Sequence, residues 1–196
     1  HRSCKKPFSP ICKCLSCDET ITSNSVTNRP NPAYQATQRA TNYSKRRSKI
    51  SAGSHTAKDG SLFHATAILG DRWNNLILGG ALYGLRRYDD FQRGLGISTN
   101  ILADRLKLLV EAGLFNRVAY QSGPKRYQYN LTSKGQDYLP VAMALHRWSE
   151  RWLPQGERGN VILSHHCEDA PVQFVFCCSA CDGVLHPHDV TTGPVG

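Results

Sequence analysis

The sequence predicts a mainly α-helical protein with one small β-hairpin, and three observations carry this prediction. A helix over 71–83 is followed, after a short basic turn, by a second short helix over 89–95. A longer helix over 99–112 then shows a regular apolar stripe. Two strands follow at 115–120 and 126–131, joined by a turn that contains Gly and Pro. This order of elements defines one compact module.

The first of these helices has a clear start and an unusual interior. Asp71 is a good N-cap residue. At helical spacing its inward face is expected to hold Trp73, Leu76, Ile77 and Ala81. Gly79 and Gly80 inside the helix should cost about 1 kcal/mol each relative to Ala, which indicates close packing by another element.

The helix over 99–112 separates into two faces at 100° per residue. One face is expected to be core and carries Leu102, Leu106, Leu109 and Val110. The opposite face is expected to meet solvent or a DNA groove and carries Asn100, Ala103, Asp104, Lys107 and Glu111.

The start of this helix is small and polar. Ser98 is expected to cap it, while Thr99 and Asn100 can approach base edges or phosphates closely. The positive end of the helix dipole adds attraction for a phosphate. Arg105 lies at the flank of the apolar stripe, so an ion pair with Asp71 or Asp90 is as well founded as a base contact.

Cationic residues surround this helix at three points. Lys125 and Arg126 stand at the hairpin tip, and Arg86 and Arg87 form the earlier turn. A solvated charge pair on a loop is common, but three such points around one helix favour phosphate contacts. Helix, turn, helix and a hairpin with a basic tip outline a winged helix-turn-helix that binds double-stranded DNA.

The charge of the chain is concentrated in its first part. Residues 1–58 hold 11 Lys and Arg against two acidic residues, which accounts for the whole formal charge of +9. We expect a basic, mostly disordered leader here, either solvated or in loose contact with phosphates. The predicted divisions are this leader, a winged-helix and dimerisation domain over 59–153, and a Cys/His tail over 154–196. We find no internal repeat.

A last long helix is predicted from Thr132 to about Trp152. Its apolar stripe consists of Val141, Leu145, Trp148 and Trp152. No run of 18 apolar residues exists, so we expect no membrane span and a cytoplasmic protein.

The eight cysteines form two groups outside the predicted winged helix. They are Cys4, Cys12, Cys14 and Cys17, then Cys167, Cys177, Cys178 and Cys181. In a cytosolic chain such groups indicate metal or redox chemistry. His165, Cys167, Cys178 and Cys181 are the predicted ligands of a structural zinc. Redox-active thiols and inert thiols in a mobile tail stay open as alternatives.

Many spaced positions within about residues 61–153 resemble the HxlR-type regulators, a branch of the MarR-like winged-helix transcription factors. The matching segments are Gly70-Asp71-Arg72-Trp73, Leu76-Ile77-Leu78, Arg86-Arg87-Tyr88-Asp89-Asp90-Phe91, Gly96-Ile97-Ser98, Arg105-Leu106, Glu111-Ala112-Gly113-Leu114 and Tyr129-Asn130-Leu131-Thr132. The resemblance implies a homodimeric repressor or activator on a palindromic operator.

The resemblance also implies pairing through the first and last helices, so Leu62 joins Val141, Leu145, Trp148 and Trp152 as an expected dimer contact. An intramolecular core is almost as good an interpretation of the tryptophans. Several family members sense oxidants through a cysteine at a position that Gly60 occupies here, so the effector is not predicted.

Parts of the sequence also bear on two other function classes. A winged helix used for protein contact, with a metal-binding or thiol redox-sensing tail, remains an alternative. A metallo-hydrolase built on His165, His166 and Cys167 lacks a carboxylate base at convincing spacing, so we expect no enzyme.

Overall fold

The computed structural model describes residues 3–32, 61–122, 125–153 and 161–190. The chain divides into two compact units. Residues 37–138 form one, the winged-helix unit, and residues 1–36 with 139–196 form the other, the terminal unit. This division does not coincide with the expected boundaries at 58 and 153. Within the described ranges no helix is long and apolar enough to cross a membrane.

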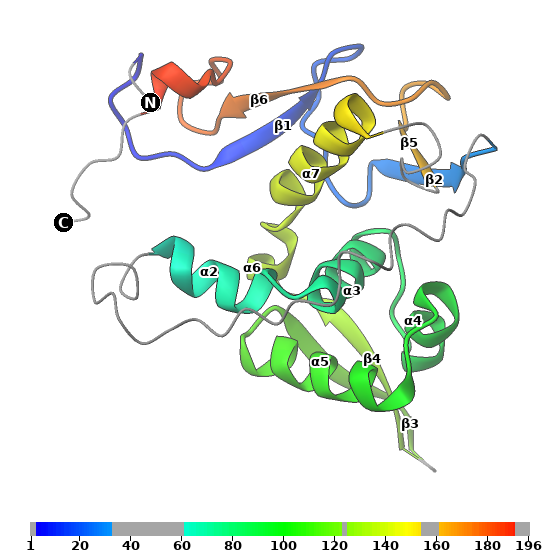
Figure 1. The fold of residues 1–196 in the computed structure, drawn as a ribbon. Helices are drawn as coiled ribbons and strands as arrows, with labels where there is room; N and C mark the ends of the chain where they lie inside the picture. Colours follow the sequence, from blue (N-terminus) through cyan, green and yellow to red (C-terminus); the bar gives the residue numbers. More distant parts are fainter. Residues whose placement is uncertain (1–2, 33–60, 123–124, 154–160, 191–196) are drawn as a thin grey trace. The chain divides into compact units, whose positions relative to one another are not determined.

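The winged-helix unit has the predicted order of elements (Figure 1). Its helices and strands are α2 Ser61–Leu69, α3 Arg72–Leu82, α4 Tyr88–Leu95, α5 Thr99–Glu111, β3 Phe115–Ser122, β4 Lys125–Leu131 and α6 Ser133–Gln136. The prediction of a winged helix-turn-helix is therefore confirmed at the level of the fold.

Helix α3 begins as predicted but buries a different face. The Asp71 carboxylate accepts hydrogen bonds from the backbone N–H groups of Trp73 and Asn74. The buried apolar residues of the helix are Ile77, Leu78, Ala81 and Leu82, whereas Leu76 is exposed. The expected inward face is thus wrong at Leu76, because the helix is turned so that Leu78 and Leu82 reach the core.

The glycine pair inside α3 is explained at one position only. A Cβ at Gly80 would lie 2.9 Å from Leu85 Cδ1, so another segment does pack closely there. A Cβ at Gly79 would meet no atom within 4 Å. Close packing therefore accounts for Gly80 and not for Gly79.

Helix α5 forms the centre of this unit's core. Leu102, Leu106 and Leu109 are fully buried, as predicted, while Val110 is half-buried. Phe91 of α4 and Phe115 of β3 pack edge to face with ring centroids 6.3 Å apart. The core thus fixes α5 against both α4 and the wing.

The wing is an antiparallel pair of strands, and a third backbone segment pairs briefly with one of them. Phe115 pairs with Leu131 and Ala119 with Tyr127 along β3 and β4, and the register shifts after Ala119. The turn before α4 pairs with the outer edge of β4, since Tyr129 N–H donates to the Arg86 carbonyl at 2.7 Å. The basic turn is therefore held at the side of the wing.

The terminal unit combines the two ends of the chain (Figure 1). Its elements are β1 Pro10–Cys14, β2 Val26–Pro30, α7 Leu139–Trp152, β5 Val161–His165, β6 Phe174–Cys178 and a short 3₁₀ helix at Pro187–Asp189. Strand β1 pairs antiparallel with β6, and β2 pairs antiparallel with β5. Arg147 of α7 donates to the Phe174 carbonyl at 2.9 Å, which fastens this helix to β6.

These strands correct the expectation of an unstructured leader. Residues 10–14 and 26–30 are strands, although their own sequence shows no strand period. Their partners are more than 130 positions away, so local pattern could not reveal the pairing. The remainder of the expected leader, from residue 33 to 58, lies outside the described residues.

The predicted last helix is in fact two helices. Helix α6 ends at Gln136, and α7 starts at Leu139. Pro140 has no N–H to donate to the carbonyl four residues earlier, at Gln136, so a continuous helix would lose a hydrogen bond there.

Candidate nucleic-acid interface and cysteine clusters

The N-terminal end of α5 presents the predicted polar surface. Ser98, Thr99 and Asn100 are all exposed, and so are Ala103 and Lys107 one and two turns further along. Ser98 occupies the N-cap position, but its side chain makes no capping hydrogen bond. The hydroxyls and the amide at this end therefore face outward in the geometry that groove contacts require.

Arg105 forms the ion pair that was one of its two predicted alternatives. Its Nε and Nη2 atoms donate to the two oxygens of Asp71 at 3.1 and 3.0 Å. Asp71 therefore both caps α3 and binds α5 through a bidentate contact. This engagement makes Arg105 a brace between the two helices, in place of a base-reading residue.

A further hydrogen bond joins the N-terminal ends of α4 and α5, the two helices of the helix-turn-helix. The Tyr88 hydroxyl donates to the Thr99 carbonyl at 2.6 Å. Together with the Arg105 contact, this bond fixes how the first turn of α5 is presented.

A basic, aromatic hollow of about 460 Å³ lies between the start of α4 and the wing. Its cations are Arg87, Arg117 and Arg126, and its aromatic residues are Tyr88, Tyr120, Tyr127 and Tyr129, with Asp89 at the edge. The Arg87 guanidinium lies 4.8 Å from the Tyr120 ring centroid, and that of Arg117 lies 3.5 Å from the Tyr127 ring centroid. Stacking on the rings holds these guanidinium groups in place without neutralising them.

The two arginines of the basic turn have different roles. Arg87 lies in this hollow, as a predicted phosphate contact should. The Arg86 guanidinium donates to the backbone carbonyls of Ala81 and Leu85, at 3.0 Å for Leu85. One guanidinium nitrogen of Arg86 is thus engaged by carbonyls at and just after the end of α3, and its role as a phosphate contact stays a prediction.

The wing strands supply a cation that the sequence prediction missed. Arg117 lies on β3, at a position where nothing but its charge distinguished it. The Lys125 side chain, a predicted phosphate contact, lies outside the described residues, and so does the side chain of Leu62.

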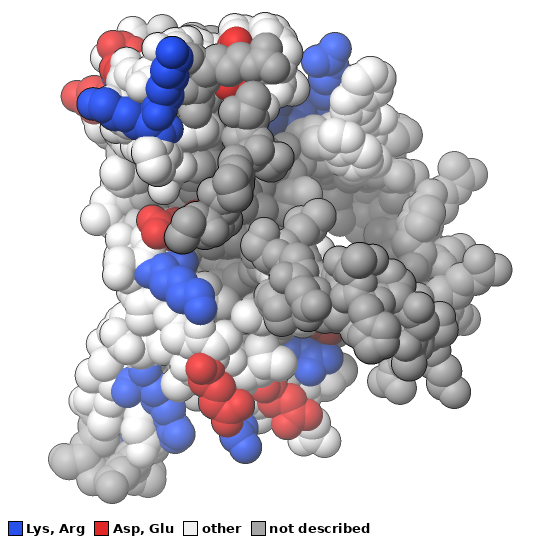
Figure 2. All heavy atoms as spheres, turned by 90° about the vertical axis from the view of Figure 1, so that its left-hand side faces the viewer, with Lys and Arg blue, Asp and Glu red and all other residues white. Residues whose placement is uncertain are grey.

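Charged side chains are interspersed on the face that Figure 2 shows, where basic and acidic groups stand side by side in small clusters. Among the described residues, Lys107 pairs with Glu111 at 3.9 Å and Arg93 pairs with Asp90 at 3.1 Å. These two cations are therefore less available to a phosphate than the arginines of the hollow beside the wing.

Helix α7 carries an exposed apolar stripe. Val141, Leu145, Trp148 and Trp152 are 43, 52, 57 and 63% exposed. The opposite side of the helix is buried at Leu139 and Met143. An intramolecular core for the two tryptophans is therefore wrong for this chain, and their interpretation as contacts to a second copy stays a prediction.

The predicted zinc ligands do not come together as one group. His165 and Cys167 join Cys14 and Cys17 in the Cys/His cluster. Cys178 and Cys181 join Cys4 in the three-thiol cluster. The expected set of four is thus corrected, because the antiparallel pairing of β1 with β6 places Cys14 opposite Phe174 and Pro10 opposite Cys178, and each half of that set meets different N-terminal cysteines.

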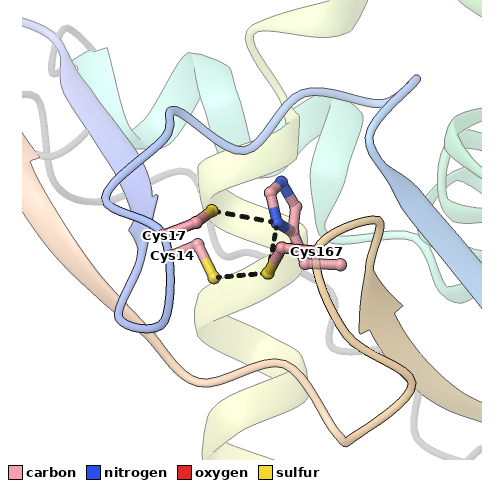
Figure 3. A group of neighbouring side chains, drawn as sticks. Cys14, Cys17 and Cys167 are labelled. Carbon is pink, nitrogen blue, oxygen red and sulfur yellow. Dashed lines mark hydrogen bonds between the residues drawn. The ribbon is translucent and has the colours of Figure 1, made fainter.

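The Cys/His cluster has four side chains that point toward one another (Figure 3). Cys14 Sγ lies 3.7 Å from Cys167 Sγ. The Nδ1 atom of His165 lies 3.5 Å from Cys17 Sγ and 3.2 Å from Cys167 Sγ. Cys14 and His165 are buried, whereas Cys167 is exposed.

The surroundings favour the ligand forms of two members of this cluster. Burial alone would raise the pKa of the Cys14 thiol, but hydrogen bonds from the backbone N–H groups of Ser16 and Cys17 oppose it, and the net effect lowers the pKa. Burial, helped by the neighbouring His166, lowers the pKa of His165. A thiol that ionises readily and a neutral imidazole are the forms that coordinate metals.

The two clusters contain loops that share one short sequence and backbone motif. Cys14-Leu15-Ser16-Cys17-Asp18 and Cys178-Ser179-Ala180-Cys181-Asp182 share the pattern Cys-x-x-Cys-Asp. The N–H of Asp18 donates to the Cys14 carbonyl at 3.0 Å, and that of Asp182 to the Cys178 carbonyl at 2.8 Å. The sequence signal was present, but five residues are too short a match to stand out.

The same loops have an uncommon backbone conformation. In the described part of the chain, the non-glycine residues with positive φ are Lys5, Asp18 and Asp182, at 53°, 61° and 62°. Each of them directly follows a cysteine of one of the two clusters. Such backbone geometry is uncommon outside glycine and concentrates at functional sites and ligand clamps.

Comparisons with known proteins agree with the fold of the winged-helix unit. Residues 68–157 match the family model described as HxlR-like helix-turn-helix. An uncharacterized HTH-type transcriptional regulator of Mycobacterium bovis is 36% identical over 145 residues, which cover 74% of this chain and 92% of the relative. The uncharacterized HTH-type transcriptional regulator YtfH of Escherichia coli is 33% identical, with 52% of this chain and 87% of the relative covered.

Two solved structures are similar over a comparable length. The crystal structure of PA1607, described as a candidate transcription factor, superposes with a TM-score of 0.59 at 30% identity and covers 71% of this chain and 99% of that one. A candidate transcription factor from Pseudomonas aeruginosa gives a TM-score of 0.51 at 38% identity and covers 68 and 92%.

Proposed function

Since the chain belongs to the HxlR-like helix-turn-helix family of transcriptional regulators, we propose that it binds a palindromic operator as a homodimer and reads the sequence with the start of α5. The relatives are transcriptional regulators, so the chain is a regulator and not an enzyme. Its site of action in this proposal is the cytoplasm, where it represses or activates transcription. The observation that carries the proposal is that the first turn of α5 is exposed while Tyr88 and Asp71 hold the helix in place.

Base readout is assigned to Thr99 and Asn100. Both are exposed, and the helix behind them is held by Tyr88 at its first turn and by Arg105 at its middle. A rigid helix end loses little conformational entropy when it enters a groove. An amide side chain can form two hydrogen bonds to an adenine edge, which discriminates by about 1–3 kcal/mol.

Phosphate binding is assigned to the hollow beside the wing. Arg87, just before α4, Arg117 on β3 and Arg126 on β4 converge there. Because these cations contact no base edge in this proposal, they contribute affinity for any duplex.

Dimerisation is assigned to α7. The exposed stripe of α7 has four large apolar residues, and its two tryptophans are each more than half exposed. Such a stripe is unusual for a monomer surface and typical of an interface core. We assign it to a second copy of the chain, because a two-fold pair of recognition helices is what a palindromic site requires.

Selection of bound duplexes from a random pool tests the proposal with the full chain. We expect an inverted repeat whose half-site centres lie about one helical turn, roughly 34–36 Å, apart. If the dimer neutralises about 6 to 10 phosphates, the logarithm of affinity should fall against the logarithm of salt with a slope of about −5 to −9. A pool without enrichment together with a flat salt response would count decisively against DNA binding.

Substitution separates readout from general affinity. Asn100→Ala should relax preference at one base position, at a cost of about 1–3 kcal/mol on the cognate duplex and little on others. Arg126→Ala should weaken all duplexes alike and reduce the salt slope by about one. Glu111→Gln, on the same exposed face at the other end of α5, is the control that should leave sequence preference unchanged.

Sedimentation tests the dimer. Trp148→Ala with Trp152→Ala should raise the dimer dissociation constant by at least about 30-fold, the equivalent of one interface residue worth about 2 kcal/mol. Val190→Ala removes an exposed apolar side chain outside α7 and should not change it. An unaltered dimer in the tryptophan variant would refute the assignment to α7.

A further inference from the structure

We infer that Cys14, Cys17, His165 and Cys167 bind one Zn²⁺ ion as a structural site that joins the two ends of the chain. The four residues come from the loop after β1 and from the end of β5 with the turn that follows it. The inference concerns the terminal unit and stands apart from how the winged-helix unit meets DNA.

Three distances between ligand atoms of the cluster are close to those of a tetrahedral zinc site. With Zn–S near 2.3 Å and Zn–N near 2.05 Å, tetrahedral angles place two sulfur ligands about 3.8 Å apart and a sulfur and a nitrogen about 3.6 Å apart. The observed Sγ–Sγ distance between Cys14 and Cys167 is 3.7 Å. The two distances from His165 Nδ1 to sulfur, 3.5 and 3.2 Å, fall near the second value.

Disulfide pairing fits the same atoms poorly. A disulfide requires an S–S distance of about 2.05 Å. One disulfide would use two of the three thiols, so it would not account for the third thiol or for the imidazole beside them. All eight cysteines, which lie within the described ranges, are free thiols in this structure. Three thiols and one imidazole around one point form a donor set that zinc prefers.

The backbone around two of the ligands has the form of a metal-binding knuckle. Cys14 and Cys17 are the first and last residues of a tight Cys-x-x-Cys turn, and backbone N–H groups of the turn point at the Cys14 sulfur. Asp18 directly after it has a φ of 61°, a conformation that costs a non-glycine residue of order 1–3 kcal/mol and persists only where the surroundings enforce it. A bound ion supplies that enforcement.

The position of the cluster in the chain shows what the ion would stabilise. Cys17 and His165 are 148 positions apart, and they lie on the two segments of the chain that the terminal unit brings together. A small unit without a large core gains most from a metal that closes a long loop.

Zinc content of the full chain tests the inference. Reduced protein loaded with Zn²⁺ and dialysed against a weak chelator should retain zinc with a Kd on the order of nanomolar or tighter. Replacement of zinc by Co²⁺ should give strong sulfur-to-cobalt absorption and the intense visible bands of tetrahedral Co²⁺. X-ray absorption of the zinc form should show both sulfur and nitrogen ligands.

A matched pair of variants assigns the site. Cys17→Ser with Cys167→Ser removes two ligands that are not fully buried, and should lower bound zinc by one equivalent per chain. Ser16→Ala with Asp169→Asn changes exposed neighbours in the same two loops and should leave the zinc content unchanged.

Three outcomes would overturn the inference: zinc that binds more weakly than micromolar, zinc content that is equal in the two variants, or a Cys14–Cys167 disulfide in metal-free protein that matches the stability of the loaded form. The first outcome needs no variant, so a failure of the ligand variant to fold cannot obscure the result.

Discussion

The winged-helix unit and the terminal unit of this protein are stabilised in different ways. The former buries leucines, isoleucine and phenylalanine from four consecutive elements, and its polar contacts add orientation. The latter brings together segments from opposite ends of the chain, and six of its buried or half-buried side chains are thiols. A core built from neighbouring elements stabilises the winged-helix unit, whereas the terminal unit needs contacts between residues far apart in the chain.

This difference has a physical origin in sequence separation. Contacts between α3, α4 and α5 join residues within about one or two elements of each other, so little loop entropy is lost when they form. Strand β1 must pair with β6 across at least 160 positions of the chain. The terminal unit therefore depends on whatever fixes its ends together, and the proposed ion is the strongest candidate.

Metal removal should produce the largest contrast between the two units. With a strong chelator under reducing conditions, amides of β5 and β6 should lose at least about 100-fold of their protection from hydrogen exchange, because the site that joins the segments is gone. Amides of α5 should keep theirs. An equal loss of protection in both units would show that they unfold together, and would contradict the claim that they are stabilised in different ways.

Asp71→Ala should act on the winged-helix unit alone. It removes the cap of α3 and the bidentate contact to Arg105, at a combined cost of about 2 kcal/mol in the free energy of unfolding. Denaturant titration measures this cost, and zinc content should stay the same. Asp104→Ala, an exposed carboxylate of α5, should change stability by less than about 0.5 kcal/mol.

Gly79→Ala should give the smallest effect, and one of opposite sign. Because a Cβ at this position meets no atom within 4 Å and the position lies inside α3, the substitution should stabilise the unit by about 0.5–1 kcal/mol. Gly80→Ala is the matched control, since its Cβ would press on Leu85 and cancel the gain. A destabilised Gly79→Ala protein would mean that another surface, such as a second copy, packs against that turn.

Sequence reasoning succeeded where one element carried its own signal. The capping carboxylate of Asp71, the buried leucines of α5 and its exposed polar start all follow from helical period and capping chemistry. It failed at Leu76 and at the grouping of the cysteines, because both depend on which neighbour occupies the space beside the residue.

The amino-acid sequence by itself determined the helix-turn-helix, the wing and the polar start of α5, since period, capping and turn residues act over a few positions. Only the tertiary structure decided that Arg105 binds Asp71 and that three arginines converge beside the wing. It also decided that N-terminal cysteines join C-terminal cysteines and a histidine in two separate clusters. Those arrangements are set by strand register and side-chain packing between residues far apart in the chain, and no local pattern encodes them.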